Sequence, residues 1–83
     1  MKIGVAGTVE SNDCLITVEE SDELEIIIES IVMEFFGEQI KKVIVDTLSE
    51  LKIKTIKVTC NDKGALDYTI KSRLVTAIKR MEG

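Results

Sequence analysis

Two kinds of hydrophobic pattern follow one another along this chain, and their order restricts the fold more than any other feature of the sequence. Apolar residues recur at every second position in residues 13–19, 23–29 and 54–60, as they do in half-buried strands. Between the last two segments they recur every three or four positions over residues 31–51, which is the spacing of an amphipathic helix. The chain therefore predicts a domain in which helices cover a sheet.

The remaining elements follow from turn residues. A first strand over residues 2–9 is joined to the second, residues 13–19, by a segment with Gly, Asn and Asp, which favours a β-hairpin. A short polar turn leads to the third strand, and three strands joined by short links favour an antiparallel meander. A turn at residues 61–64 follows the fourth strand, and a second helix is predicted over residues 65–81, although residues 68–70 could instead extend a strand.

The element order is thus β-β-β-α-β-α. It predicts a single two-layer α+β domain over residues 1–83, with a small, mostly antiparallel four-stranded sheet and two helices on one face. Ser30 is a suitable N-cap for the first helix, because its hydroxyl can accept a hydrogen bond from a free backbone N–H of the first turn. One wide apolar stripe follows, formed by Ile31, Val32, Phe35, Phe36, Ile40, Val43, Ile44, Leu48 and Leu51.

Composition argues against several classes of function. The chain has no His, which removes the commonest general base and metal ligand and disfavours a self-contained hydrolase or metalloenzyme. Cys14 and Cys60 stand alone in strand-like segments, so a metal site is not expected and both are predicted to be buried free thiols. No apolar segment has the length of a membrane span. Two lone cysteines without a signal-peptide pattern indicate the reducing cytoplasm.

The charges are distributed unevenly. Residues 1–38 contain ten acids and one base, a net charge of −9, and residues 39–83 contain five acids and ten bases, a net charge of +5. Either the two halves lie against each other and compensate, or an acidic face near the hairpin steers a basic partner. Lys52, Lys54 and Lys57 form a small basic run without interleaved aromatic residues, which favours a solvated strand edge over a nucleic-acid site.

Ser11 is the candidate functional residue. It lies in the turn of the predicted hairpin, where its hydroxyl is expected to face water, and a turn serine by itself indicates no function. The surrounding segment, Gly7-Thr8-Val9-Glu10-Ser11-Asn12-Asp13, resembles the Gly-Thr-Leu-Glu-Ser-x-Asp segment of the citrate lyase acyl carrier protein family, the γ subunit of that complex. The resemblance resumes at residues 29–40, 46–51 and 62–67, in the same order and at similar separations.

The resemblance implies a non-catalytic carrier subunit. Ser11 would bear a phosphoribosyl-dephospho-CoA group through a phosphodiester, and the thiol of this group would carry acetyl and then citryl thioesters. The α subunit, an acyl transferase, would exchange acetyl for citrate, and the β subunit, a citryl lyase, would release oxaloacetate. A separate transferase would attach the group. Glu10 and Asp13 would either be recognised by that transferase or only solubilise the tip.

Other motifs in the sequence allow different interpretations. Asp46-Thr47-Leu48 faintly resembles the attachment motif of fatty-acid-type carriers, but it lies inside the first helix and has no central Ser. Lys63 could resemble the lysine of a biotinyl or lipoyl carrier, yet Gly64 explains its turn better. The alternative from another class is a small regulatory or assembly module that binds a metabolite or a partner protein and carries no covalent cofactor.

Overall fold

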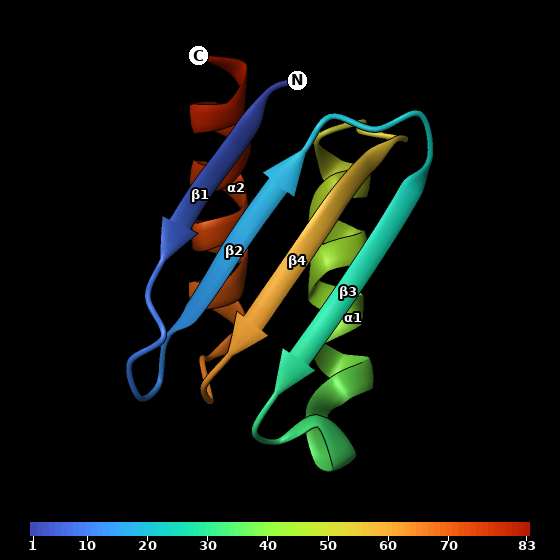
Figure 1. The fold of residues 1–83 in the computed structure, drawn as a ribbon. Helices are drawn as coiled ribbons and strands as arrows, with labels where there is room; N and C mark the ends of the chain where they lie inside the picture. The colour runs from blue at the N-terminus through green and yellow to red at the C-terminus, as the bar shows by residue number, and fades with distance from the viewer.

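The computed structural model describes residues 1–83 and arranges them in two layers, a four-stranded sheet and a pair of helices (Figure 1). Both helices lie against the same face of the sheet, as predicted. The elements are β1 (Ile3–Gly7), β2 (Cys14–Glu19), β3 (Leu24–Ser30), α1 (Met33–Glu50), β4 (Ile56–Asp62) and α2 (Asp67–Glu82). This is the predicted order, and the α+β class is confirmed.

The sheet has the strand order β1-β2-β4-β3, so the neighbour of β3 is β4 and not β2. β1 pairs with β2 and β2 pairs with β4 in antiparallel fashion, whereas β3 runs parallel to β4. The sheet is therefore mostly antiparallel, as predicted. The prediction of an antiparallel meander for the first three strands is wrong.

The connection through α1 explains the parallel pair. A parallel neighbour requires a crossover of a dozen or more residues, usually a helix, and the 18 residues of α1 supply it. The link between β2 and β3 passes over one end of β4 in Figure 1, so that β4 inserts between these two strands. The alternating pattern of β3 is compatible with either neighbour, because it sets which face is buried and not which strand lies beside it.

The core lies between the two layers. β2 and β4 alternate buried and half-buried residues along their whole length, as the period of two predicts. α2 packs on β1 and β2, and α1 contacts β3 and α2. The buried apolar set consists of Ala6, Cys14, Ile16, Val18, Ile40, Ile44, Leu48, Ile56, Val58, Cys60, Ile70, Leu74, Ala77 and Ile78. Both cysteines are free and fully buried, as predicted.

Gly4 determines how closely α2 approaches β1. A Cβ atom at this position would overlap the Ala77 carbonyl oxygen and lie 2.6 Å from the Met81 backbone nitrogen. Because backbone atoms cannot move aside as a flexible side chain can, only glycine permits this approach. Near the same strand, Nη1 of Arg80 donates a hydrogen bond of 2.8 Å to the Val5 carbonyl oxygen.

The first helix begins later than predicted. Ser30 is the last residue of β3 and pairs with Asp62 of β4, so its backbone belongs to the sheet and the N-cap position falls to Val32. The prediction of Ser30 as the N-cap is therefore wrong, although its Oγ atom does accept a hydrogen bond of 3.1 Å from the Val32 N–H. The start of the predicted apolar stripe does not reach the sheet either: Phe35 and Phe36 are exposed.

The C-terminal end of α1 is closed by a lysine in a left-handed backbone conformation. Lys52 adopts a left-handed conformation, with φ of 58°, directly after the C-cap residue Leu51. The Lys52 N–H donates a hydrogen bond of 3.0 Å to the Ser49 carbonyl oxygen, and the Ile53 N–H donates one of 3.0 Å to the Leu48 carbonyl oxygen. This is the Schellman pattern that usually places glycine at the position of Lys52.

The second helix begins at Asp67, two residues after the predicted start. Tyr68, Thr69 and Ile70 are helical, so the alternative in which they extend a strand is wrong. Thr69 and Ile70 donate backbone hydrogen bonds to the Leu66 carbonyl, which closes the first turn. Neither helix of the structure has the length and apolar character needed to cross a membrane.

Candidate functional site

The predicted hairpin is confirmed, and its loop carries Ser11. Residues 8–13 join β1 to β2, which pair antiparallel up to Gly7 and Leu15. The Asp13 N–H donates a 3.2 Å hydrogen bond to the Glu10 carbonyl, which closes a four-residue turn. Gly7 and Asn12 adopt positive φ angles of 96° and 66°, conformations that Gly and Asn tolerate best. The residues of the loop thus favour the chain reversal that joins β1 to β2.

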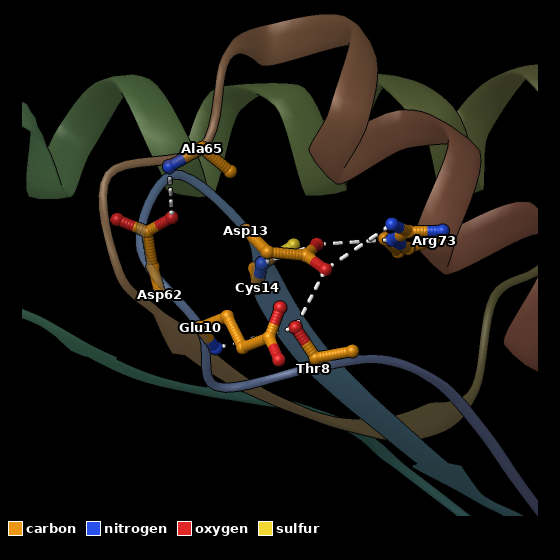
Figure 2. A network of polar contacts seen from close by, with 7 residues as sticks. All are labelled: Thr8, Glu10, Asp13, Cys14, Asp62, Ala65 and Arg73. Atoms are coloured by element: carbon orange, nitrogen blue, oxygen red, sulfur yellow. Dashed lines mark hydrogen bonds and ion pairs between the residues drawn. The ribbon is translucent and has the colours of Figure 1, made fainter.

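Asp13 holds the loop from within (Figure 2). Its Oδ2 atom accepts a hydrogen bond of 2.8 Å from the Thr8 hydroxyl, and its Oδ1 atom accepts one of 2.7 Å from the Cys14 N–H. The Thr8 hydroxyl in turn accepts a hydrogen bond of 3.2 Å from the Glu10 N–H. Asp13 therefore anchors the loop instead of facing solvent at its tip, a role that the sequence analysis did not predict.

Arg73 connects this loop to α2. Its Nε and Nη2 atoms lie 3.0 and 3.2 Å from the two carboxylate oxygens of Asp13, the paired geometry that makes an Arg–carboxylate contact strong and directional. The hydrogen bonds from Arg73, then from Thr8 and the Cys14 backbone, lower the pKa of Asp13 to about 2. The same pairing raises the pKa of Arg73. The charge of Asp13 is thus offset beside the candidate serine.

The segment after β4 supports the loop from a second side. The Asn12 N–H donates a 2.8 Å hydrogen bond to the Lys63 carbonyl, and the Lys63 N–H donates a 2.9 Å bond to the Asp13 carbonyl. These bonds extend the pairing of β2 and β4 into the turn regions. The backbone on the C-terminal side of Ser11 is therefore held by a segment about fifty positions further along the chain.

Asp62 organises that supporting segment. Its side chain is buried, and its oxygens accept hydrogen bonds from the Ser30 hydroxyl at 2.7 Å, the Gly64 N–H at 3.1 Å and the Ala65 N–H at 2.9 Å. Figure 2 shows Asp62 directed toward Ala65. The sequence pattern predicted only a turn at Asp62. An Asp two residues before a Gly at the end of a strand was the available signal, because such side chains bond the following backbone.

Ser11 itself is exposed, as predicted. The hydrogen bonds that shape the loop come from its backbone and from the side chains of Thr8 and Asp13, which leaves the Ser11 hydroxyl free. Ser11 thus presents a primary alcohol on a firmly held backbone, and the loop between β1 and β2 to which it belongs lies at one end of the molecule (Figure 1). This arrangement suits the covalent attachment of a group by another enzyme, because a modifying enzyme needs access to the oxygen and a defined position for it.

The other residues that the sequence singled out make contacts within the fold. The Thr47 hydroxyl is buried and donates a 2.7 Å hydrogen bond to the Val43 carbonyl within α1, in agreement with its assignment to the helix. Lys57 pairs with Glu19 across the sheet at 3.7 Å. A hydrogen bond with the Cys14 thiol, and after it burial, raise the pKa of the Cys60 thiol. No group of three or more His, Cys, Asp or Glu side chains is arranged to hold a metal ion.

The ion pairs show to what extent the acidic and the basic half of the chain compensate each other's charge. Arg73–Asp13 and Lys57–Glu19 each join the basic half of the chain to the acidic half, whereas Lys42–Asp46 and Lys71–Glu50 lie within the basic half. The two halves therefore compensate in part. Glu10, in the loop that carries Ser11, remains exposed, as does Glu34 on the first turn of α1, and Figure 1 shows these two segments at the same end of the molecule.

Comparisons with known proteins point to carriers of acyl groups. The family model described as Malonate decarboxylase delta subunit (MdcD) matches residues 1–81. The citrate lyase acyl carrier protein of Treponema denticola is 47% identical over 76 residues, which cover 92% of this chain and 87% of that protein. The protein of the same name from Albidiferax ferrireducens is 48% identical over 85 aligned positions, covering 100% of this chain and 87% of the relative.

A solved structure shares the fold. A chain in the crystal structure of a Pseudomonas malonate decarboxylase hetero-tetramer in complex with malonate superimposes with a TM-score of 0.84. The match covers 96% of this chain and 84% of that chain, and the sequences are 16% identical. At this identity the likeness concerns the fold alone.

Proposed function

Because this chain belongs to the citrate lyase acyl carrier protein family, we propose that it is the acyl carrier subunit of a citrate lyase and that Ser11 carries the prosthetic group. The observation that supports the attachment site most directly is the free, exposed Ser11 hydroxyl on an anchored hairpin loop. The chain itself would carry the acyl group, and the larger subunits would supply the catalytic residues.

The residues present fit a phosphodiester-linked group. A group joined to the Ser11 oxygen begins in solvent at the tip of the loop and displaces no hydrogen bond of the loop. The phosphodiester adds negative charge beside Asp13, and the Arg73 guanidinium already pairs with that carboxylate at 3.0 Å. This pairing reduces the repulsion that an unpaired carboxylate would exert on a neighbouring phosphate.

The resemblance to the citrate lyase carriers points to phosphoribosyl-dephospho-CoA as this group, whose thiol would hold acyl groups as thioesters. The protein contributes an anchored root for the arm. Thr8, Asp13 and Arg73 fix the loop, so movement is confined to the arm itself. Tethering makes each transfer effectively intramolecular, which raises the local concentration of the acyl group and limits its loss.

The partners in this proposal are the α subunit, an acyl transferase, the β subunit, a citryl lyase, and the transferase that attaches the group. Together the lyase subunits convert citrate to acetate and oxaloacetate in the cytoplasm. The chain's own contribution is to present one site to two active centres in turn. A rigid domain with a single exposed attachment point is sufficient for this task.

Mass spectrometry tests the attachment site. Intact mass is measured before and after co-expression with the prosthetic-group transferase, for the wild type and for Ser11→Ala. We expect one added group in the wild type and none in the variant, with the circular dichroism of the variant unchanged, since a surface substitution of this kind changes stability by only about 0.5 kcal/mol. Ser21→Ala is the matched control, because Ser21 also lies in a loop, and it should be modified normally.

Two results would oppose this proposal. An added mass that persists in Ser11→Ala would place the group on another residue. Material purified from a natural host that is bare at Ser11, while the lyase still converts citrate, would contradict a carrier role for this residue. Peptide mapping of the modified protein distinguishes these cases.

A further inference from the structure

All aromatic residues of this chain are exposed. The sequence contains two Phe, one Tyr and no Trp. Phe35, Phe36 and Tyr68 expose 78%, 55% and 72% of their surfaces. Large aromatic side chains normally supply much of a protein's core because each buries a large apolar area. In this chain the core consists of aliphatic residues and cysteine, so the aromatic residues are available for another contact.

These residues gather at the first turns of the two helices. Phe36 and Tyr68 line a recess of about 550 Å³ between α1 and α2, together with Val32, Ile40, Ala65 and Leu66. At its rim, Nε2 of Gln39 donates a 2.7 Å hydrogen bond to Asp67, which links the two helices. Phe35 precedes Phe36 on α1 and lies outside the recess. We call Ile31, Phe35, Phe36, Leu66 and Tyr68 the aromatic patch; all five are exposed.

The first turns of α1 and α2, which carry most of the patch, lie at the same end of the molecule as the loop between β1 and β2, which carries Ser11 (Figure 1). The segment after β4 connects them, because Gly64 borders the recess and its backbone position also faces the hairpin loop. A Cβ atom on Gly64 would lie 3.7 Å from Oδ1 of Asn12 and 4.0 Å from Cδ1 of Ile31. Asn12 follows Ser11 directly. A molecule that covers the patch is therefore brought next to the root of the arm.

We propose that the aromatic patch is the docking surface for the catalytic subunits of the lyase. This inference rests on the proposed function and specifies which face of the carrier those subunits bind. The partner surface would have an apolar protrusion or recess that meets the aromatic side chains, with Lys or Arg around it. The charges of the carrier indicate this basic rim, because three exposed acids adjoin members of the patch: Glu34 directly precedes Phe35 on α1, Glu38 follows Phe35 at i+3, and Asp67 lines the recess.

The area of the patch is consistent with a protein partner. A fully buried aromatic side chain contributes roughly 150–250 Å², so the exposed fractions of these three leave roughly 300–500 Å² for a contact. Ile31 and Leu66 enlarge this area toward the roughly 800 Å² that one partner contributes to a standard interface. Exposed apolar areas of several hundred Å² on a small protein usually mark an interaction site, and aromatic residues are over-represented among the strongest contacts.

Two other occupants fit the structure less well. The prosthetic arm folded back into the recess would cover Phe36 and Tyr68 but not Phe35, which is the most exposed of the three and does not line the recess. A second copy of the chain would place the exposed acids of two identical rims, including Glu34 and Glu38, against each other. A partner with a basic rim covers all three aromatic residues without this repulsion.

The test uses the unmodified chain, produced without the transferase, and measures its affinity for each purified larger subunit by calorimetry. We expect the double substitution Phe35→Ser with Tyr68→Ser to weaken binding to at least one subunit by about tenfold or more. Ile3→Ser and Leu51→Ser are matched controls, because these apolar residues are 52% and 42% exposed at the other end of the molecule. They should bind within about threefold of the wild type.

Each alternative has its own signature. Unchanged affinity of the double variant for both subunits would overturn the inference. A dimer of the isolated wild type that the double variant abolishes would assign the patch to self-association and would also overturn it. The inference would also be overturned if attachment of the prosthetic group shifted the amide resonances of Leu66 and Tyr68 while both subunits bound the double variant with wild-type affinity. Because the binding assay needs no modification, loss of docking is separable from failure of Ser11 to be modified.

Discussion

Replacing Asp62 by Asn tests whether a buried carboxylate organises the end of the sheet next to Ser11. The carboxylate accepts three hydrogen bonds, two at Oδ2 from Ser30 and Gly64 and one at Oδ1 from Ala65. An Asn amide has one acceptor oxygen and an NH₂ group that only donates. Whichever way the amide is oriented, its NH₂ faces a backbone N–H of Gly64 or Ala65.

The expected cost follows from that mismatch. Leaving one buried donor unsatisfied destabilises a protein by about 1–3 kcal/mol, and the contacts that survive are weakened because the acceptor is no longer charged. We therefore expect the free energy of unfolding to fall by about 2 kcal/mol. For small domains the free energy of unfolding falls by about 1 kcal/mol per molar urea, so the urea concentration at the midpoint of unfolding should fall by about 2 M.

Urea unfolding followed by circular dichroism measures this midpoint, and Asp46→Asn is the matched control. Asp46 is exposed and pairs only with Lys42 on the same helix, at 2.6 Å, so its substitution should cost about 0.3–0.5 kcal/mol. Hydrogen exchange at the Gly64 and Ala65 amides should accelerate in Asp62→Asn. A midpoint equal to that of Asp46→Asn, with exchange unchanged, would refute the role assigned to Asp62.

Three further predictions follow from single contacts. Hydrogen bonds from Arg73, then from Thr8 and the Cys14 backbone, lower the pKa of Asp13 from 3.8 to about 2, so the folded state favours the carboxylate. The resulting stabilisation is complete above about pH 4 and is lost as pH falls toward about 2. Because Arg73 is the largest of these causes, urea midpoints at about pH 5 and about pH 2.5 should differ less in Arg73→Ala than in the wild type. Gly4→Val forces α2 away from β1 and should lower the free energy of unfolding by about 3 kcal/mol in the same assay, whereas a midpoint like that of the wild type would show that the helix adjusts freely. Lys52→Gly relieves a left-handed backbone and should raise that free energy by about 0.5–1 kcal/mol; destabilisation would contradict the conformation assigned to Lys52.

The exposure of Phe35 and Phe36 shows a limit of pattern analysis. A stripe of apolar residues predicts that one face of a helix is covered, but it does not identify what covers it. α1 begins beyond the end of β3, so its first turn extends past the sheet and carries these aromatic residues with it. A part of the pattern that was assigned to the core is therefore available to a partner.

The sequence by itself determined the element types, the hairpin and the position of Ser11 within it, because these depend on neighbouring residues: alternation sets the buried face of a strand, and Gly and Asn permit the reversal. The tertiary structure alone decided that β4 lies between β2 and β3, and that Arg73 and Asp62 support the serine loop. Arg73 and Asp13 are 60 positions apart, and Ser30 and Asp62 are 32 apart. The physical reason is that strand neighbours and long-range hydrogen bonds are selected by the packing of the whole chain, to which local periodicity is insensitive.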